Sequence, residues 1–503
     1  DIGYPEYFHP QLSPVSLNFA CGFSGVRSAP FADEFSYLEL GAGPGTTAAI
    51  LAAANPRGHF YCADFNPDHV AAANRLKDEA GLTNLTVLEA GFAGLAAGSV
   101  ELPACDIVAM SGVYSWVNRE QRAHILTVLD RYVKPGGIVY VNYNAMPGWS
   151  AASALQRLVL EVSDASEGAR GSRLTSTRQW LQQFAACDPR FLADTTTLAF
   201  RLDSIQTSED GYVAHEFMDR GWEALYHWDV AESFAAAGLE FAATTDFPRI
   251  QVDLLRTPAQ RSLLDGVAPR MRETMKDFLD NASLRHDVFV RGARRMSRPD
   301  FAQWLDRAGL GLVPDRSRER AEDASDPRAA ALLRLLADRG PLTFAELRQG
   351  IAEAGEIRFG ELLGFACGII ADGGAVPYLR PATPPDREPA RRLNTVIARR
   401  ACGGGAAFAA PAVGSGIRLG LLDTVVLSAL LTGGDARAGS LAEQARAGAV
   451  EHGLDITVEG RVRRAADVTH RELVALVEAV RRDHAPIWER LGLTETAVVD
   501  DAA

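Results

Sequence analysis

The chain has 503 residues, 47% of them hydrophobic and 23% charged, which is typical of a folded globular protein of about three domains rather than a disordered one. Its 51 basic and 64 acidic side chains give a net charge of −13, which argues against a general polyanion binder. The six cysteines form no C-x-x-C pair and no metal-ligand spacing with histidine, so we expect reduced thiols, a cytoplasmic protein and no metal site.

Strand-like and helix-like segments alternate through the first 150 residues. Helix signals separate the strands, such as the N-cap residue Asn66 before Pro67 and the helix breaker Pro-Gly-Gly at 135–137. The predicted strands are residues 35–40, 60–64, 85–90, 106–110 and 138–143. Strands separated by helices predict an α/β fold with a doubly wound, mostly parallel, Rossmann-like sheet.

Beyond the fifth strand, changes in composition divide the chain into further units. Residues 238–241 lead into a strand, which indicates that the sheet resumes after a polar helical insertion; the alternative is a separate domain. A charged linker at 315–328 and a proline-rich linker at 380–392 enclose a helix–turn–helix–strand unit that resembles a winged helix. The predicted units are an α/β core at 1–255 with a helical insertion at about 151–212, a helical middle region at 256–320, a winged-helix-like module at 328–380 and a helical C-terminal domain at 392–503.

A glycine turn directly follows the first predicted strand. Glu39 lies near the end of that strand, and Gly41, Gly43 and Gly45 form a G-x-G-x-G pattern ahead of an alanine-rich helix. A pyrophosphate needs an open, positive helix end, whereas Glu39 adds negative charge beside the turn. The turn therefore favours a cationic, amino-acid-like ligand such as S-adenosylmethionine. The alternative is a turn that only packs the helix on the sheet.

Asp64 ends the second predicted strand. A carboxylate at this point accepts hydrogen bonds from both ribose hydroxyls, in NAD and in S-adenosylmethionine alike. It therefore indicates a nucleoside without choosing between the two cofactors. Its alternative role, capping the next helix, is already filled by Asn66.

Polar and aromatic residues follow the fourth and fifth predicted strands. The carboxyl ends of parallel strands meet at the edge where open α/β sheets bind their ligands. Tyr114, Asn142 and Asn144 are therefore candidate site residues. Trp116 and Trp149 either line the same pocket or anchor their loops on the core.

The glycine turn, together with Asp64, resembles the class I S-adenosylmethionine-dependent methyltransferases. Residues 112–116 (Gly-Val-Tyr-Ser-Trp) and 143–149 (Tyr-Asn-Ala-Met-Pro-Gly-Trp) resemble a narrower group, the bacterial methyltransferases that carry a methyltransferase regulatory domain. This group includes the rickettsial protein-lysine methyltransferases, and its characterised members methylate lysines on bacterial outer-membrane proteins. Further matching phrases lie at 215–217, 226–231 and 287–292. Two positions depart from the pattern, since Ser111 replaces the usual histidine and Gly91 the usual serine.

The resemblance implies a role for individual residues. Those implied to bind the cofactor are Glu39, Gly41, Gly43 and Gly45 for the methionine part, Asp64 for the ribose, Phe65, Gly91 and Phe92 around the adenine, and Ser111 at the mouth of the pocket. Those implied to contact the substrate are Tyr4, Tyr7, Trp116, Asn142, Asn144 and Trp149. The first two belong to residues 4–10, which form either a lid or an ordinary ordered arm.

Methyl transfer from a sulfonium depends chiefly on placing a neutral nucleophile in line with it. A lysine amine has a pKa of about 10.4, so it must first lose a proton. A desolvated slot lowers that pKa, and a tyrosine, a carboxylate or a water chain takes the proton. Tyr114 is the first candidate for orienting the amine, with Glu216 and His215 as weaker ones. Tyr114→Phe is then expected to lower turnover without weakening cofactor binding.

These observations predict a cytoplasmic S-adenosylmethionine-dependent N-methyltransferase that acts on a lysine of a protein substrate. The alternatives are a methyltransferase for a small molecule or a surface-glycan precursor and a cofactor-binding regulator without turnover, while an NAD-dependent dehydrogenase is least favoured. The winged-helix-like module has six arginines and six acidic residues, so we expect it to dock proteins or pair subunits in a homodimer rather than bind nucleic acid. We also expect no signal peptide and no membrane span.

Overall fold

A computed structural model describes residues 7–27, 34–193, 196–250, 256–314, 326–401, 404–458 and 461–494. Tyr4 and most of the linker predicted at 315–328 lie outside this description. None of the described helices combines the length and the apolar character that crossing a bilayer requires.

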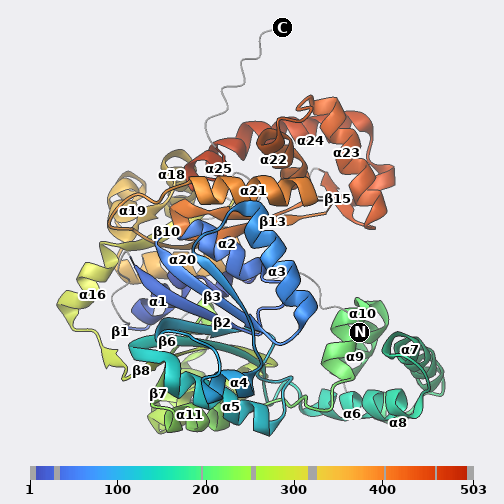
Figure 1. Cartoon of the computed structure of the whole chain (residues 1–503). Coiled ribbons are helices and arrows are strands. Elements are labelled where there is room, and N and C mark those ends of the chain that lie inside the picture. The colour runs from blue at the N-terminus through green and yellow to red at the C-terminus, as the bar shows by residue number, and fades with distance from the viewer. Residues whose placement is uncertain are drawn as a thin grey trace.

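A seven-stranded sheet forms the centre of the fold (Figure 1). Its strands are β2 (Phe35–Leu40), β3 (Gly58–Asp64), β4 (Leu85–Glu89), β5 (Cys105–Met110), β6 (Val133–Asn144), β7 (Leu239–Thr244) and β8 (Leu284–Arg291). They lie in the order β4-β3-β2-β5-β6-β8-β7, and β8 runs in the direction opposite to the other six strands. The structure confirms the predicted α/β class with a doubly wound, mostly parallel sheet.

Helices cover both faces of this sheet. One face packs against α1 (Pro14–Phe23), α2 (Thr46–Ala54) and α3 (Pro67–Ala80), and the other against α4 (Phe92–Ala97), α5 (Arg119–Tyr132) and α11 (His227–Ala236). The local signals are those expected from the sequence. The side chain of Asn66 accepts the backbone N–H of Asp68 at 2.9 Å, and Gly81 ends α3 with a φ of 60°.

One local prediction is wrong. Pro135, Gly136 and Gly137 were expected to separate a helix from the strand, but α5 ends at Tyr132 and β6 begins at Val133. A register shift opposite these residues accommodates them, since the pairing of β5 with β6 is irregular between Cys105 and Ile107.

The predicted helical insertion projects from the sheet as an arm (Figure 1). It consists of α6 (Ser150–Ala165), α7 (Arg170–Ala186), α8 (Arg190–Ala193), α9 (Thr196–Thr207) and α10 (Asp210–Phe217). The arm has an apolar core of its own, which includes Trp149, Leu181 and Phe217. It runs five residues beyond the end predicted at about residue 212, because α10 packs back onto α6 and α7.

The boundary predicted at residue 255 is wrong, because the sheet continues to Arg291. Helices α12 (Phe247–Ile250), α14 (Pro258–Gly266) and α15 (Arg272–Asp280) lead from β7 into β8, which inserts between β7 and β6. Residues 284–291 were not predicted as a strand because Arg285 and Asp287 interrupt the run of apolar residues that is typical of a buried strand. The region predicted as helical at 256–320 also contains β9 (Arg294–Arg295), which pairs with β1 (Val26–Arg27), as well as α16 (Arg298–Leu305) and β10 (Ala308–Leu312).

The predicted helix–turn–helix–strand order is present after the first linker. It comprises α18 (Pro327–Arg339), β11 (Leu342–Thr343), α19 (Phe344–Gly350), α20 (Phe359–Ala371) and β12 (Ala375–Leu379). The sequence missed the middle strand of its sheet, since β10 lies between β11 and β12 and comes from before the linker.

The C-terminal region is mainly helical, as predicted, but it also contains two hairpins. Its elements are α21 (Glu388–Arg400), β13 (Ala406–Ala410), β14 (Ser415–Leu419), α22 (Leu421–Thr432), α23 (Ala438–Glu451), β15 (Asp455–Val458), β16 (Arg461–Arg464), α24 (His470–Asp483) and α25 (Ala485–Leu491). Helix α21 and the first hairpin pack directly on α2 and α3, above the blue strands in Figure 1. The side chain of Asn55, just after α2, donates to the carbonyl of Gly414 at 3.0 Å. One continuous apolar core therefore joins the sheet to the C-terminal region.

Candidate active site

The glycine turn between β2 and α2 has the backbone geometry that the sequence predicted. Gly41, Gly43 and Gly45 have φ angles of 68°, 55° and 76°, a region that favours glycine. A Cβ on Gly41 would lie 2.6 Å from Val113, and one on Gly45 2.7 Å from Ala73. No atom lies within 4 Å of a Cβ placed on Gly43. Two of the glycines are thus required by packing, and the middle one borders open space where a ligand can approach.

Side chains at the carboxyl ends of the strands share one face of the sheet. Glu39 lies opposite Cys62 on β3 and, through Ala109, in line with Tyr140 on β6. Because side chains alternate along a strand, Asp64 and Asn142, each two residues further on, lie on this same face. The face is the one covered by α1 and α2.

Glu39 is 4% exposed, and its Oε2 has no hydrogen-bond partner among the described residues. Burial, reinforced by the charge of Asp64, raises the pKa of Glu39 to about 8. A buried carboxylate oxygen without a partner is costly and fits a cationic group of a ligand. The carboxylate of Glu39 at the turn therefore fits the ammonium group of an amino-acid-like cofactor.

Asp64 binds the glycine turn directly, a role that sequence reasoning did not foresee. Its Oδ2 accepts the backbone N–H of Gly43 at 2.8 Å, and its Oδ1 accepts that of Asn66 at 2.9 Å. Its Oδ1 also lies 3.3 Å from Nδ1 of His69. Oδ2 keeps a further lone pair, which leaves an acceptor for the predicted ribose contact.

Two aromatic residues, Phe65 and Phe92, lie after the carboxyl ends of β3 and β4. Phe65 follows β3, is 76% exposed, and its Cβ lies 3.8 Å from the position of a Cβ on Gly91. Phe92 begins α4 and is half-buried. An exposed ring beside Asp64 presents a flat apolar surface, which agrees with the adenine contact expected for this group.

Asn142 fixes the loop that follows β5. Its Oδ1 accepts the backbone N–H of Gly112 at 2.8 Å, and its Nδ2 donates to Oγ of Ser111 at 3.0 Å. The structure thus brings Asn142 and Ser111 together, as their strand-end positions predicted. The amide of Asn142 is engaged in positioning this loop.

Glu216 is the centre of a second cluster, and it joins the arm to two strand ends. Its Oε1 accepts from Nδ2 of Asn144 at 2.7 Å, and its Oε2 accepts from Nε1 of Trp116 at 3.0 Å. The side chain is 3% exposed. Burial raises its pKa to about 7, although the hydrogen bonds from Asn144 and Trp116 oppose the rise. A carboxyl group that titrates near neutrality is suited to accepting a proton.

Tyr114 lies in a different environment. It is 3% exposed, and its ring contacts Phe234 of α11 at a centroid distance of 5.5 Å. The guanidinium of Arg122 lies 5.8 Å from the ring centroid. Burial raises the pKa of the phenol to about 12, so it stays protonated at neutral pH. As a proton acceptor, Glu216 is better placed than Tyr114.

The remaining predicted residues occupy separate places. Trp149 is 1% exposed and packs against Trp222 at 4.8 Å, so it anchors the arm, which is the second of the two roles expected for it. His215 is half-buried on α10. Tyr7 is 47% exposed, and its carbonyl accepts from Oγ1 of Thr47, which fixes the N-terminal segment beside the start of α2.

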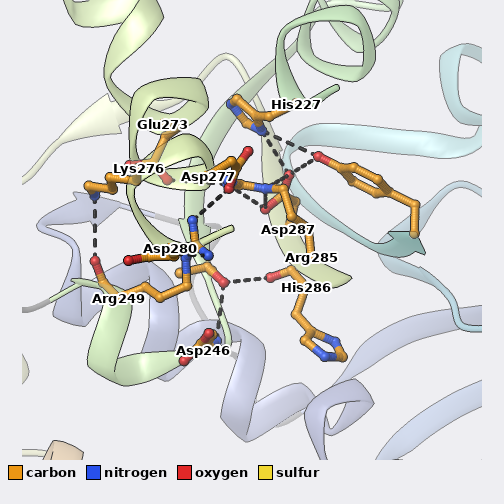
Figure 2. A network of polar contacts seen from close by, with 12 residues as sticks. His227, Asp246, Arg249, Glu273, Lys276, Asp277, Asp280, Arg285, His286 and Asp287 are labelled. Atoms are coloured by element: carbon orange, nitrogen blue, oxygen red, sulfur yellow. Dashed lines mark hydrogen bonds and ion pairs between the residues drawn. The ribbon is translucent and has the colours of Figure 1, made fainter. Parts of the chain in front are cut away.

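A buried charged network adjoins strand β6 (Figure 2). Three of its members, Tyr143, His227 and Asp287, lie in the sequence phrases that resemble the family, and Asp277 and Arg285 were not expected. The hydroxyl of Tyr143 donates to Oδ2 of Asp287 at 2.6 Å, and Nδ1 of His227 lies 2.9 Å from the same oxygen. Nε of Arg285 donates to both Asp287 oxygens, and its Nη1 donates to Asp277 at 2.6 Å. The network joins α11 and α15 to the strand that carries Asn142 and Asn144.

The charge of Asp287 is balanced inside this network. Burial alone would raise its pKa, but the Arg285 guanidinium and His227 hold it far below its usual range. The side chains of Asp287 and Arg285 are 0% and 2% exposed. The pair is therefore ionised and largely shielded from water.

Two families of known domains match this chain. A family described as "Methyltransferase domain" matches residues 38–139, and one described as "Predicted methyltransferase regulatory domain" matches residues 209–291. Residues 38–139 are thus similar to methyltransferase domains, and residues 209–291 are similar to methyltransferase regulatory domains. The first contains the glycine turn and Asp64, in agreement with the S-adenosylmethionine cofactor expected from the sequence. The second contains Glu216 and most of the buried network around Asp287.

Relatives cover most of the chain. An uncharacterized protein of Synechocystis sp. (sll1526) is 28% identical over 449 residues, which are 85% of this chain and 86% of that protein. An uncharacterized protein of Rickettsia prowazekii (RP789) is 24% identical over 44% of this chain and 41% of its own. A solved structure described as PKMT2 from Rickettsia typhi in complex with AdoHcy is 18% identical in sequence. It matches 96% of this chain and 99% of its own, with a TM-score of 0.68. This similarity confirms the class I methyltransferase fold.

Proposed function

We propose that this chain is an S-adenosylmethionine-dependent N-methyltransferase that methylates lysine side chains of proteins, with bacterial outer-membrane proteins as the expected substrates. The observation that carries the proposal is the buried carboxyl group of Glu216, held by Asn144 and Trp116 at the carboxyl edge of the sheet, with a pKa of about 7. An amine acceptor needs such a group, because an ammonium has no lone pair with which to attack. The fold shared with PKMT2 supports the same class of reaction.

The residues that would hold the cofactor lie on one face of the sheet. Glu39 would bind the ammonium group, Gly43 would admit the methionine part beside the turn, and Asp64 would bind the ribose. When bound, S-adenosylmethionine supplies a methyl group activated by its sulfonium. The complex of PKMT2 with AdoHcy supports this assignment.

The protein's own contribution is to place and deprotonate the amine. Glu216 would take the proton at a carboxylate oxygen, while Asn144 and Trp116 keep that oxygen oriented. Burial of the cluster lowers the pKa of a bound lysine, since a desolvated amine favours its neutral form. Orientation of the neutral amine then supplies most of the rate.

Glu39 gives cofactor binding a pH dependence. Its pKa of about 8 means that the carboxylate, which is the form that binds an ammonium, is a minority species at neutral pH. The affinity for S-adenosylhomocysteine is therefore expected to rise roughly tenfold from about pH 7 to about pH 8.5. Glu39→Gln should bind more weakly and lose this dependence. Isothermal titration calorimetry checks both points, and a pH dependence retained in the variant would contradict the role of Glu39. NAD is the control ligand and should not bind.

Mass spectrometry tests the proposed substrate. The purified chain is incubated with S-adenosylmethionine and unmethylated outer-membrane proteins, and lysines are expected to gain about 14 Da per methyl group. Glu216→Gln is the control for contaminating activity. If methyl groups are transferred only to small molecules or glycan precursors, the proposal of a protein substrate is wrong. Binding of S-adenosylhomocysteine without any transfer would indicate a regulator.

A further inference from the structure

A cavity of about 460 Å³ opens beside the candidate active site, and six separate parts of the chain line it. The residues that matter are Ser16 of α1, Thr245 and Asp246 after β7, His286 of β8, and Ser415 and Arg418 of the hairpin β13–β14. No residue discussed as binding the cofactor belongs to this lining. The cavity is therefore a separate compartment.

Strand register places the cavity next to the strand that carries the polar site residues. His286 on β8 lies directly opposite Asn142 on β6, and its Nδ1 is 2.8 Å from the hydroxyl of Tyr140. Thr245 continues β7, and its backbone N–H donates to the carbonyl of His286 at 3.0 Å. The cavity thus borders the carboxyl edge of the sheet, where this fold binds its ligands.

Several polar groups of the lining have no partner in the described part of the chain. Thr245 is 7% exposed and Ser415 3% exposed, yet Oγ1 of Thr245 and Oγ of Ser415 make no hydrogen bond there. No hydrogen bond to the carboxyl group of half-buried Asp246 is found there either. The hydrogen bonds of this residue are made by its backbone: the N–H donates to Oγ1 of Thr244, and the carbonyl accepts the N–H of Arg249 (Figure 2). Buried polar groups in proteins are as a rule hydrogen-bonded, so unpartnered ones at a cavity indicate a ligand.

The charges around the cavity decide what kind of ligand it fits. Burial lowers the pKa of His286 to about 4, so its ring is neutral at neutral pH. Arg418 is exposed and lies over the ring of Tyr7, at 5.9 Å. Arg249 and Arg285 are the cations whose charge acts on Asp246, and each is paired with Asp277 at 2.6 Å. The carboxyl group of Asp246 is thus the one acidic group of the described lining, and it lacks a counter-ion of its own.

We propose that this cavity binds a primary ammonium group of the substrate, namely a second lysine side chain adjoining the one that is methylated. Asp246 would neutralise the ammonium, and the hydroxyls of Thr245 and Ser415 would accept its remaining hydrogens. This inference rests on the proposed function. It also assigns the C-terminal hairpin a direct part in substrate choice, because Ser415 belongs to it.

The test uses pentylamine, an ammonium on a chain of lysine length, and pentanol as its uncharged counterpart. Binding to the full chain saturated with S-adenosylhomocysteine is measured by saturation-transfer NMR. Asp246→Asn and Thr245→Val are each expected to weaken pentylamine binding at least about fivefold. Asp455→Asn, on the exposed hairpin β15–β16, is the matched control and should change nothing.

Three results would overturn the ammonium site. They are unchanged pentylamine binding in both cavity variants, equally tight binding of pentanol, and loss of pentylamine binding in Glu216→Gln alone. The Thr245 variant decides the question if the Asp246 variant does not fold. Failure of S-adenosylhomocysteine to bind the wild-type chain would instead overturn the proposed function, so the two failures are distinguishable.

Discussion

Replacing Asp287 with asparagine is expected to lower the free energy of unfolding by about 2–3 kcal/mol, because the buried guanidinium of Arg285 loses one of its carboxylate partners and keeps Asp277 and Glu273. Tyr143 and His227 lose the same acceptor oxygen. Urea denaturation followed by circular dichroism measures the effect. An unchanged unfolding midpoint would show that the network does not stabilise the fold.

An exposed ion pair provides the matched control. Asp265→Asn removes the partner of Arg272, at 2.8 Å on the surface, and should cost less than about 1 kcal/mol. The Asp287 effect also has a pH signature. Since the pKa of Asp287 is lower in the folded chain than in the unfolded one, its contribution is present above about pH 4 and is lost as the pH falls below that value. The difference between variant and wild type should shrink accordingly in acid.

Replacing Glu216 with glutamine is expected to lower kcat by a factor of about 10²–10⁴, because the amide cannot accept the proton of the amine. The affinity for S-adenosylhomocysteine should not change, since no cofactor role is assigned to Glu216. In the wild type, kcat should rise as the pH increases through about 7, where Glu216 ionises. The variant should lack this step.

Tyr114→Phe distinguishes the two candidates for the proton acceptor. If Glu216 fills the role, this variant keeps kcat within about threefold of the wild type, because it leaves the packing on Phe234 intact. A large loss of kcat in Tyr114→Phe together with a normal Glu216→Gln would contradict this assignment and support the role in orienting the amine that the sequence predicted for Tyr114.

The parts of the site that the sequence predicted depend on local patterns. The glycine turn, Glu39 and Asp64 lie within or next to single strands, and their residue types follow directly from the backbone geometry there. The strand-end positions of Asn142 and Asn144 were predicted on the same basis. Such features need no knowledge of distant contacts.

The parts that the sequence missed depend on contacts between distant residues. Glu216 meets Asn144 across 72 positions of the chain, and nothing in either segment specifies that pairing. Strand β8 was not predicted because it contains the charged residues Arg285 and Asp287. The charge of Asp287 is tolerated inside the sheet because Tyr143 and His227, both distant in the sequence, bond to its carboxylate. Cytoplasmic location, a homodimer and the absence of nucleic-acid binding stay predictions.

The antiparallel strand β8 has a consequence for synthesis of the chain on the ribosome. It fills the place between β6 and β7, so β6 has no partner on that side until residue 291 has left the ribosome. While the ribosome synthesises the helical arm and the helices after β7, strand β6 is therefore an unpaired edge of the nascent sheet. An unpaired strand edge is a site for aggregation. The order of elements along the chain therefore makes residues 284–291 the last part of the sheet to be completed.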